Sequence, residues 1–284
     1  MDPRAAGAVA VRRWPAGAGW QELAVASSAL VAQGAARRVV GYREHHAAPQ
    51  RWREVPHAAV VLVLSLGEPF RVGVADGAPR PMPGFVAGLH DRFAMVESDG
   101  AAECVQVDLA PAAAARLLGL PLVELANRVV PVDEVLGQWS RELTGRLAAA
   151  RHWETRLALL EAALQRRLAS ATPVAGDLAA ALARLEASGG ALAIGALARE
   201  IGCSRKHLTT RFRQTLGLPP KTLARVLRFD RLVRHINTAT GARWAELAAA
   251  AGYYDQAHLA RDVCDFTGLA PRAWLAQHHL PYDG

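Results

Sequence analysis

Two copies of one helix-turn-helix pattern, fifty residues apart, constrain the last third of this chain more than any other sequence feature. In each copy a short apolar segment ends at a glycine, Gly202 or Gly252, and a second segment begins after Ser204 or Asp255. Glycine adopts the left-handed conformation that a sharp turn after a helix needs. A serine or aspartate side chain accepts a hydrogen bond from a free N–H at a helix start. The pattern therefore predicts two helix pairs in one polypeptide.

The second helix of each pair should have one apolar and one polar face. Leu208 with Phe212 and Leu259 with Val263 are spaced i, i+4, so these residues are expected to face the core. Because the second helix of such a pair lies in the major groove of DNA, the outward polar side chains are candidate contacts with double-stranded DNA. They are Arg205, Lys206, Thr209, Thr210 and Arg213 in the first unit, and Gln256, His258 and Arg261 in the second.

The segment from Pro219 to Ile236 joins the two units and predicts a single helix. Proline suits the first turn, whose N–H groups have no partner within the helix. About 18 residues span roughly 27 Å at 1.5 Å per residue, and successive major-groove sites on one face of DNA lie about 34 Å apart. We therefore expect a rigid connector that lets the two recognition helices reach adjacent major grooves.

Residues from about Leu192 to Gln277 resemble the AraC/XylS family of transcriptional regulators. The resemblance is most specific in Gly252-Tyr-Tyr-Asp-Gln-Ala-His-Leu and in Thr-Gly-Leu-Ala-Pro-Arg-Ala-Trp274. It implies an all-helical, sequence-specific DNA-binding domain in a bacterial regulator, with RNA polymerase as a further partner if the protein is an activator. It implies that bases are read by Lys206, Thr209 and Thr210 in the first unit and by Gln256, His258 and Arg261 in the second, and that Arg225 and Arg228 contact phosphates.

The charge distribution agrees with this interpretation. The 284 residues carry a formal net charge of +7, and the segment from Arg199 to Arg243 holds eleven Lys and Arg residues but only two acidic ones. A concentrated basic field is typical of phosphate binding. The second unit departs from the family in having Asp262 and Asp265 after the recognition arginine. Since carboxylates repel phosphates, we expect the second unit to contribute less affinity.

Composition and motifs exclude several other classes of protein. The three cysteines, Cys104, Cys203 and Cys264, are isolated, which argues against a disulfide framework. No apolar run reaches the 18 residues of a membrane span, and no secretory signal is evident, so we expect a cytoplasmic protein without membrane contact.

The amino-terminal half predicts a β-rich domain followed by helices. The apolar run from Ala58 to Leu66 suits a strand buried on both faces, and turn residues separate further alternating segments. After Pro111 the apolar period becomes helical. The expected fold class is α+β with two domains, a cupin-like or related sensor domain and an all-α double helix-turn-helix domain. The expected boundaries are a flexible tail over 1–19, with a helix beginning near Gln21, a sensor domain over 20–171 and a DNA-binding domain over 172–284, with a joint at Pro173 to Gly176.

The stretch from Arg53 to Pro131 also resembles an uncharacterised domain often fused to AraC-type tails. A small-molecule effector is expected there, in an apolar pocket lined by Tyr42, Trp52, Phe85 and Phe93, with core packing as the alternative role of these four residues. His45, His46, His57 and His90 lack the compact His-x-His pattern of metal-binding cupins. We therefore predict no metal, no cofactor and no enzymatic activity.

Two other interpretations remain open for the amino-terminal half. It could be a metal-dependent cupin-type enzyme tethered to DNA, or a regulatory domain that binds a partner protein. Leucines at helical spacing additionally suggest a homodimer held through Leu157, Leu160 and Leu164, with packing inside the sensor domain as the alternative.

Overall fold

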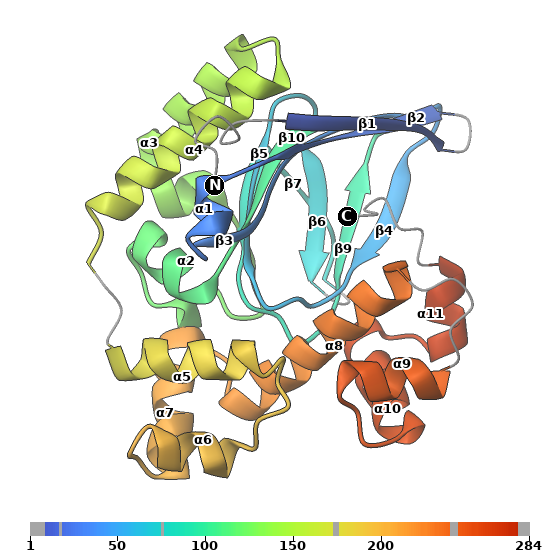
Figure 1. The fold of residues 1–284 in the computed structure, drawn as a ribbon. Coiled ribbons are helices and arrows are strands. Elements are labelled where there is room, and N and C mark those ends of the chain that lie inside the picture. Colours follow the sequence, from blue (N-terminus) through green and yellow to red (C-terminus); the bar gives the residue numbers. More distant parts are fainter. Residues whose placement is uncertain (1–8, 17–18, 75–76, 173–175, 239–243, 278–284) are drawn as a thin grey trace.

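The computed structural model describes residues 9–16, 19–74, 77–172, 176–238 and 244–277. Strands and a few helices make up the amino-terminal half, and the carboxyl-terminal half is helical (Figure 1). The predicted α+β class, with a β-rich domain followed by helices and then an all-helical domain, is confirmed. Of the predicted joint at Pro173 to Gly176, residues 173–175 lie outside the described part of the chain.

Two antiparallel sheets form the β-rich domain. The larger sheet has the order β1 (Val9–Ala16), β2 (Gly19–Ala26), β3 (Ala36–His45), β10 (Ala101–Leu109), β5 (Val60–Ser65), β8 (Gly84–Ala87) and β11 (Val129–Pro131). The smaller sheet has the order β4 (Gln50–Glu54), β9 (Ala94–Ser98), β6 (Phe70–Val74) and β7 (Arg80–Met82). Apolar side chains from both sheets meet in one cluster between them.

Strand β5 is buried along its whole length, which confirms the interpretation of the apolar run at Ala58 to Leu66. Side chains alternate between the two faces of a strand. Val61 and Val63 therefore join the cluster between the sheets, whereas Leu62 and Leu64 join the core shared with the helices. Both strand edges are also paired, with β10 on one side and β8 on the other.

The structure differs from the sequence-based expectation at the start of the chain. The predicted tail over 1–19 contains strand β1, which pairs with β2 from Val9–Ala26 to Ala16–Gly19. The helix expected from Gln21 is likewise strand β2, and only α1 (Ala29–Ala32) is helical. The prediction was wrong because the composition, rich in Ala, Gly and Pro, suggested a loop, whereas pairing with the neighbouring strand β3 decides the conformation.

Helices cover one face of the larger sheet (Figure 1). They are α2 (Pro111–Leu118), the single turn η1 (Leu122–Glu124), α3 (Val132–Ala149) and α4 (Trp153–Ala169). The leucines proposed for a dimer interface, Leu157, Leu160 and Leu164, are at most 1% exposed within the single chain. The dimer hypothesis is therefore wrong in its choice of surface, because a side chain already buried in its own domain cannot meet a partner.

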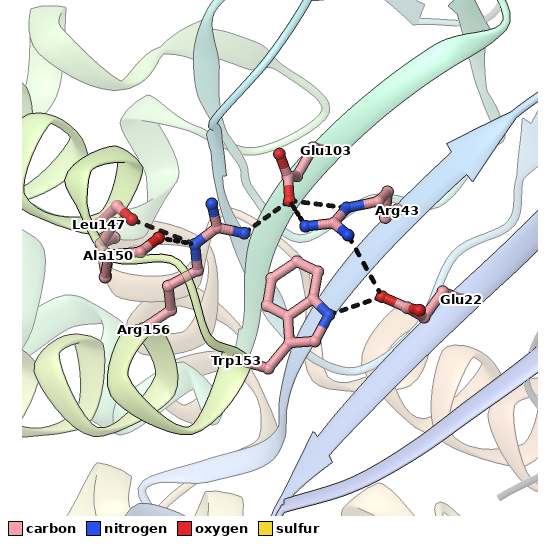
Figure 2. A network of polar contacts seen from close by, with 7 residues as sticks. All are labelled: Glu22, Arg43, Glu103, Leu147, Ala150, Trp153 and Arg156. Atoms are coloured by element: carbon pink, nitrogen blue, oxygen red, sulfur yellow. Dashed lines mark hydrogen bonds and ion pairs between the residues drawn. The ribbon is translucent and has the colours of Figure 1, made fainter.

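A polar network fastens α4 to the larger sheet (Figure 2). Arg156 donates to Glu103 Oε1 at 2.5 Å and to two carbonyl oxygens at the end of α3. Glu103 also accepts from Arg43 Nε at 2.8 Å, and Trp153 Nε1 donates to Glu22 at 2.8 Å. Burial raises the pKa of Glu103, but hydrogen bonds from Arg156 and Arg43 outweigh it, and the pKa lies below its ordinary value.

The helical half consists of α5 (Gly176–Ala187), α6 (Ile194–Glu200), α7 (Arg205–Leu216), α8 (Pro220–Thr238), α9 (Trp244–Ala251), α10 (Gln256–Thr267) and α11 (Pro271–Gln277). Helix α8 runs between the two helix pairs (Figure 1), where the sequence predicted a connector from Pro219 to Ile236. Phe229 of α8 packs against Phe266 and Trp274, with ring centroids 5.2 and 5.5 Å apart. Within the described residues, every helix is too short or too polar to cross a membrane.

Candidate nucleic-acid interface

Both turns have the geometry that the sequence predicted. Gly202 and Gly252 adopt left-handed conformations, with φ of 77° and 84°. Ser204 Oγ accepts a hydrogen bond from the N–H of His207 at 3.1 Å, and Asp255 Oδ1 accepts one from the N–H of His258 at 2.7 Å. These caps fix where α7 and α10 begin, and therefore which side chains occupy the first turn of each recognition helix.

The apolar face of each unit is buried as predicted. Ala198 and Ala248, where the helices cross closely, are 1% and 3% exposed. The recognition helices are anchored by large apolar side chains that are at most 3% exposed, namely Leu208 and Phe212 in α7, and Leu259, Val263 and Phe266 in α10.

The first recognition helix presents a basic and polar face. Arg205, Lys206, Thr210 and Arg213 are all exposed on α7. Thr209 is half-buried, and its hydroxyl donates to the carbonyl oxygen of Arg205 at 2.8 Å. All five candidate contacts of this unit are thus carried by one short helix.

The second recognition helix offers fewer charges. Gln256 and Arg261 are exposed on α10, whereas His258 is half-buried with its ring edge-on to Tyr253, 5.2 Å between centroids. Sequence reasoning missed Tyr254, which is 94% exposed and directly precedes the capping Asp255. The available signal was that Tyr254 is a large aromatic residue in a predicted turn, where no apolar periodicity assigns it to the core.

Arg225 of α8 has partners within the protein. Its guanidinium lies 2.8 Å from Asp262 Oδ1, pairs with Asp265, and stacks over the ring of Phe266 at 5.0 Å. Burial lowers the pKa of Arg225, but the two carboxylates more than compensate, so the pKa is raised. The acidic residues that depart from the family pattern therefore hold α10 to the connecting helix.

Arg228, one turn further along α8, is also engaged internally. Its Nη1 donates to the carbonyl oxygen of Gly190 at 2.7 Å, and its guanidinium lies 5.9 Å from the ring centre of Tyr253. Burial, followed by the charge of the nearby Asp262, raises the pKa of Tyr253. Contact of Arg225 and Arg228 with phosphates stays a prediction. In the structure both side chains also make contacts within the protein.

The four aromatic residues proposed for an effector pocket are divided between two places. Tyr42, Trp52 and Phe85 gather in the apolar cluster between the sheets. The Tyr42 hydroxyl donates to Glu44 Oε2 at 2.5 Å inside the domain. Phe93 lies elsewhere, against Gly268 at the end of α10. No group of three or more side chains suited to a metal ion occurs among the described residues.

Two family models match the chain. Residues 197–277 match one described as a helix-turn-helix domain, and residues 38–131 match a domain of unknown function, DUF6597. The second match overlaps the stretch that resembled an uncharacterised domain in the sequence. A comparison with curated proteins found no match.

Solved structures similar to this chain include two that are described as AraC-type or AraC-like. A transcriptional regulator from Chromobacterium violaceum, with an AraC-type DNA-binding domain, is 26% identical over 37% of this chain and 95% of that chain, with a TM-score of 0.33. ToxT from Vibrio cholerae O395 is 10% identical over 85% of this chain and 98% of that chain, with a TM-score of 0.48. The AraC-like transcriptional activator CuxR is 17% identical over 83% and 89% of the two chains, with a TM-score of 0.33.

The first family match agrees with the motifs and the capped recognition helices of the helical half, and the second covers residues 38–131 of the sheet-rich half. The chain therefore carries a helix-turn-helix domain over residues 197–277, where its motifs resemble the AraC/XylS family, preceded by a domain of unknown function over residues 38–131, and this combination supports a DNA-binding transcriptional regulator.

Proposed function

We propose that this chain is a sequence-specific transcriptional regulator that inserts α7 and α10 into adjacent major grooves of double-stranded DNA. The observation that carries the proposal is the pair of capped recognition helices, each with a buried apolar face and an exposed polar face. Lys206, Thr209 and Thr210 would read bases from α7, while Gln256, His258 and Arg261 would do so from α10. Arg205 and Arg213 would add contacts to the first site.

The spacing of the two units supports two-groove binding. Helix α8 has 19 residues, which corresponds to about 28 Å at 1.5 Å per residue. Adjacent major-groove sites on straight DNA are about 34 Å apart. We infer that bound DNA bends toward the protein, at a cost of a few kcal/mol that the second set of contacts offsets.

The two units are expected to contribute unequally. Helix α7 exposes three basic side chains, Arg205, Lys206 and Arg213. Of the charged residues of α10, Asp262 and Asp265 pair with Arg225, and Arg261 is the exposed base. The first unit would therefore supply most of the salt-sensitive affinity, and the second unit would add sequence discrimination through a few side chains.

We propose that the amino-terminal domain regulates this binding in the bacterial cytoplasm, in response to a small-molecule effector. Tyr42, Trp52 and Phe85, which share one apolar cluster, would respond to it. A partner protein is the second candidate for the regulatory signal, and RNA polymerase is a further partner if the protein activates transcription. Homodimerisation would have to use a surface other than the buried leucines of α4. An enzymatic role, the remaining alternative, would require stoichiometric metal in the purified protein.

The test begins with DNA duplexes that the full-length chain enriches from a random library. Arg261→Ala should weaken binding to the enriched duplex by about 1–3 kcal/mol and relax selectivity at one base pair. Binding to random DNA should be unchanged. Arg146→Ala is the matched control, because Arg146 is an exposed arginine on α3 of the other domain. Equal weakening on enriched and random duplexes would show that Arg261 does not read a base.

A further inference from the structure

Both recognition helices end at a glycine that lies directly against the amino-terminal domain. Gly217 after α7 and Gly268 after α10 are left-handed, with φ of 81° and 69°. A Cβ atom at position 217 would lie 3.0 Å from Val123 Cα and still closer to Ala126, and one at position 268 would lie 2.8 Å from Phe93 Cε1. The two helix-turn-helix units therefore meet the other domain at equivalent points.

The two contacting loops are joined to each other by Asn127. Its side-chain oxygen accepts a hydrogen bond from the N–H of Asp91 at 2.9 Å, and its own N–H donates to the carbonyl oxygen of Leu89 at 2.9 Å. Next to it, the N–H of Gly88 donates to the carbonyl oxygen of Arg128 at 3.1 Å. The loop that carries Phe93 and the loop that carries the contacts to Gly217 are thus one bonded unit.

Asn127 adopts an unusual backbone conformation to make these bonds. Its φ is 55°, and among the described residues it alone is left-handed without being a glycine. Asparagine tolerates this region better than most residues, although at some cost. A conformation of this kind persists only where the surrounding contacts require it.

The ring of Phe93 also contacts a cation. The guanidinium of Arg53 lies 5.0 Å from the centre of the Phe93 ring. The ring is half-buried, and it closes over Gly268. The contact at the second unit is therefore a fixed aromatic surface on a loop that Asn127 also ties down.

We propose that these two loops, residues 88–93 and 122–128, form an interdomain clasp that fixes the orientation of α7 relative to α10, with Asn127 as its positioning residue. The inference rests on the proposed function, because relative orientation matters only to a protein that binds two grooves at once. A preorganised pair of helices binds both grooves without a further loss of conformational freedom.

The clasp positions the recognition helices without covering them. The contacts at Gly217 and Gly268 lie at the carboxyl-terminal ends of the two helices, whereas Arg205 and Lys206 at the start of α7 and Gln256 at the start of α10 are exposed. The amino-terminal residues of a recognition helix are those that meet base edges. The clasp therefore fixes the relative orientation of α7 and α10, and it leaves the residues at the start of each helix exposed to DNA.

Three single substitutions in the full-length chain test the clasp. Asn127→Gly keeps the left-handed backbone and removes the acceptor for Asp91, whereas Asn127→Asp keeps both the conformation and the acceptor. Phe93→Ala removes the contact to Gly268 at a half-buried position. Circular dichroism and thermal melting confirm that each variant is folded before binding is measured.

The probes are the duplex most enriched by the wild-type chain from a random library and the same duplex with the element read by α10 scrambled. Asn127→Gly and Phe93→Ala should each bind the intact duplex about tenfold more weakly and the scrambled duplex as the wild type does. Asn127→Asp should behave as the wild type on both. The slope of affinity against salt should not change, because no phosphate contact is removed.

The possible contrary results separate the two proposals. Unchanged affinity of folded Asn127→Gly and Phe93→Ala for the intact duplex would overturn the clasp alone. Tighter binding would also overturn it, since the loops would then restrain the helices in an unproductive arrangement. A wild-type chain that enriches no duplex at all would overturn the proposed function, and the clasp with it.

Discussion

Arg225 could contact DNA or hold the recognition helix α10 in place, and these two roles can be distinguished by experiment. Asp262, its nearest partner, is 2% exposed, and its second oxygen, Oδ2, has no hydrogen-bond partner. Removing one member of a buried ion pair costs about 3–5 kcal/mol. The Arg225 side chain is 27% exposed, so water screens part of this interaction. For Arg225→Ala we take the lower end, about 3 kcal/mol, including the lost stacking on Phe266.

Hydrogen exchange in the full-length chain reports this loss locally. About 3 kcal/mol should raise the exchange rate of the α10 amides by roughly a hundredfold, while α2 and α4 stay protected. Asp265→Asn is the matched control, because Asp265 is 58% exposed and an exposed pair contributes only about 0–1 kcal/mol. Replacing both members of the buried pair, as in Arg225→Met with Asp262→Leu, should restore most of the protection.

The salt dependence of DNA binding supplies the second half of the test. A residue that only positions α10 should leave the slope of log affinity against log salt unchanged, whereas a lost phosphate contact flattens it by about 0.9. The reasoning is refuted if Arg225→Ala leaves α10 protected within twofold of the wild type and flattens the slope by about one unit.

Two further predictions concern the amino-terminal domain. His90 is 8% exposed, and burial, reinforced by the charge of His57, lowers its pKa. The free energy of unfolding should therefore be constant above the ordinary histidine pKa of about 6.5 and fall as the pH drops below it. In urea titrations, His90→Gln should remove that fall. Leu160 is fully buried in α4, so Leu160→Ala should cost about 3 kcal/mol of stability in the same titrations. Sedimentation of Leu160→Ala should match that of the wild type, and a variant that instead dissociates a wild-type dimer would return these leucines to an interface.

Much of the helical half could be predicted because local chemistry determines it. Gly202, Ser204, Gly252 and Asp255 act on their immediate neighbours, so turn and cap positions follow from the sequence. The partners of Arg225 could not be predicted in this way. Asp262 and Asp265 lie 37 and 40 positions further along the chain, and only the packing of α10 on α8 brings them together.

The sequence predicted that the amino-terminal half is β-rich, but it did not predict the first strand, β1. The apolar run of β5 is long enough to identify a doubly buried strand. Strand β1 has no such signal, because it is largely exposed and, among the described strands, pairs with β2 alone. Phe93 illustrates the same limit for the candidate sites, since nothing near it in the sequence indicates that it meets Gly268.

The hairpin of β1 and β2 also has a consequence for how the protein can be shortened. Strand β2 covers the edge of β3, which would otherwise present a row of free backbone N–H and C=O groups. The outermost strand carries Arg12, Arg13 and Pro15, the residue types that discourage another chain from adding to a sheet edge. Cutting the chain after Ala26 would remove both strands, uncover the edge of β3 and favour aggregation through strand addition.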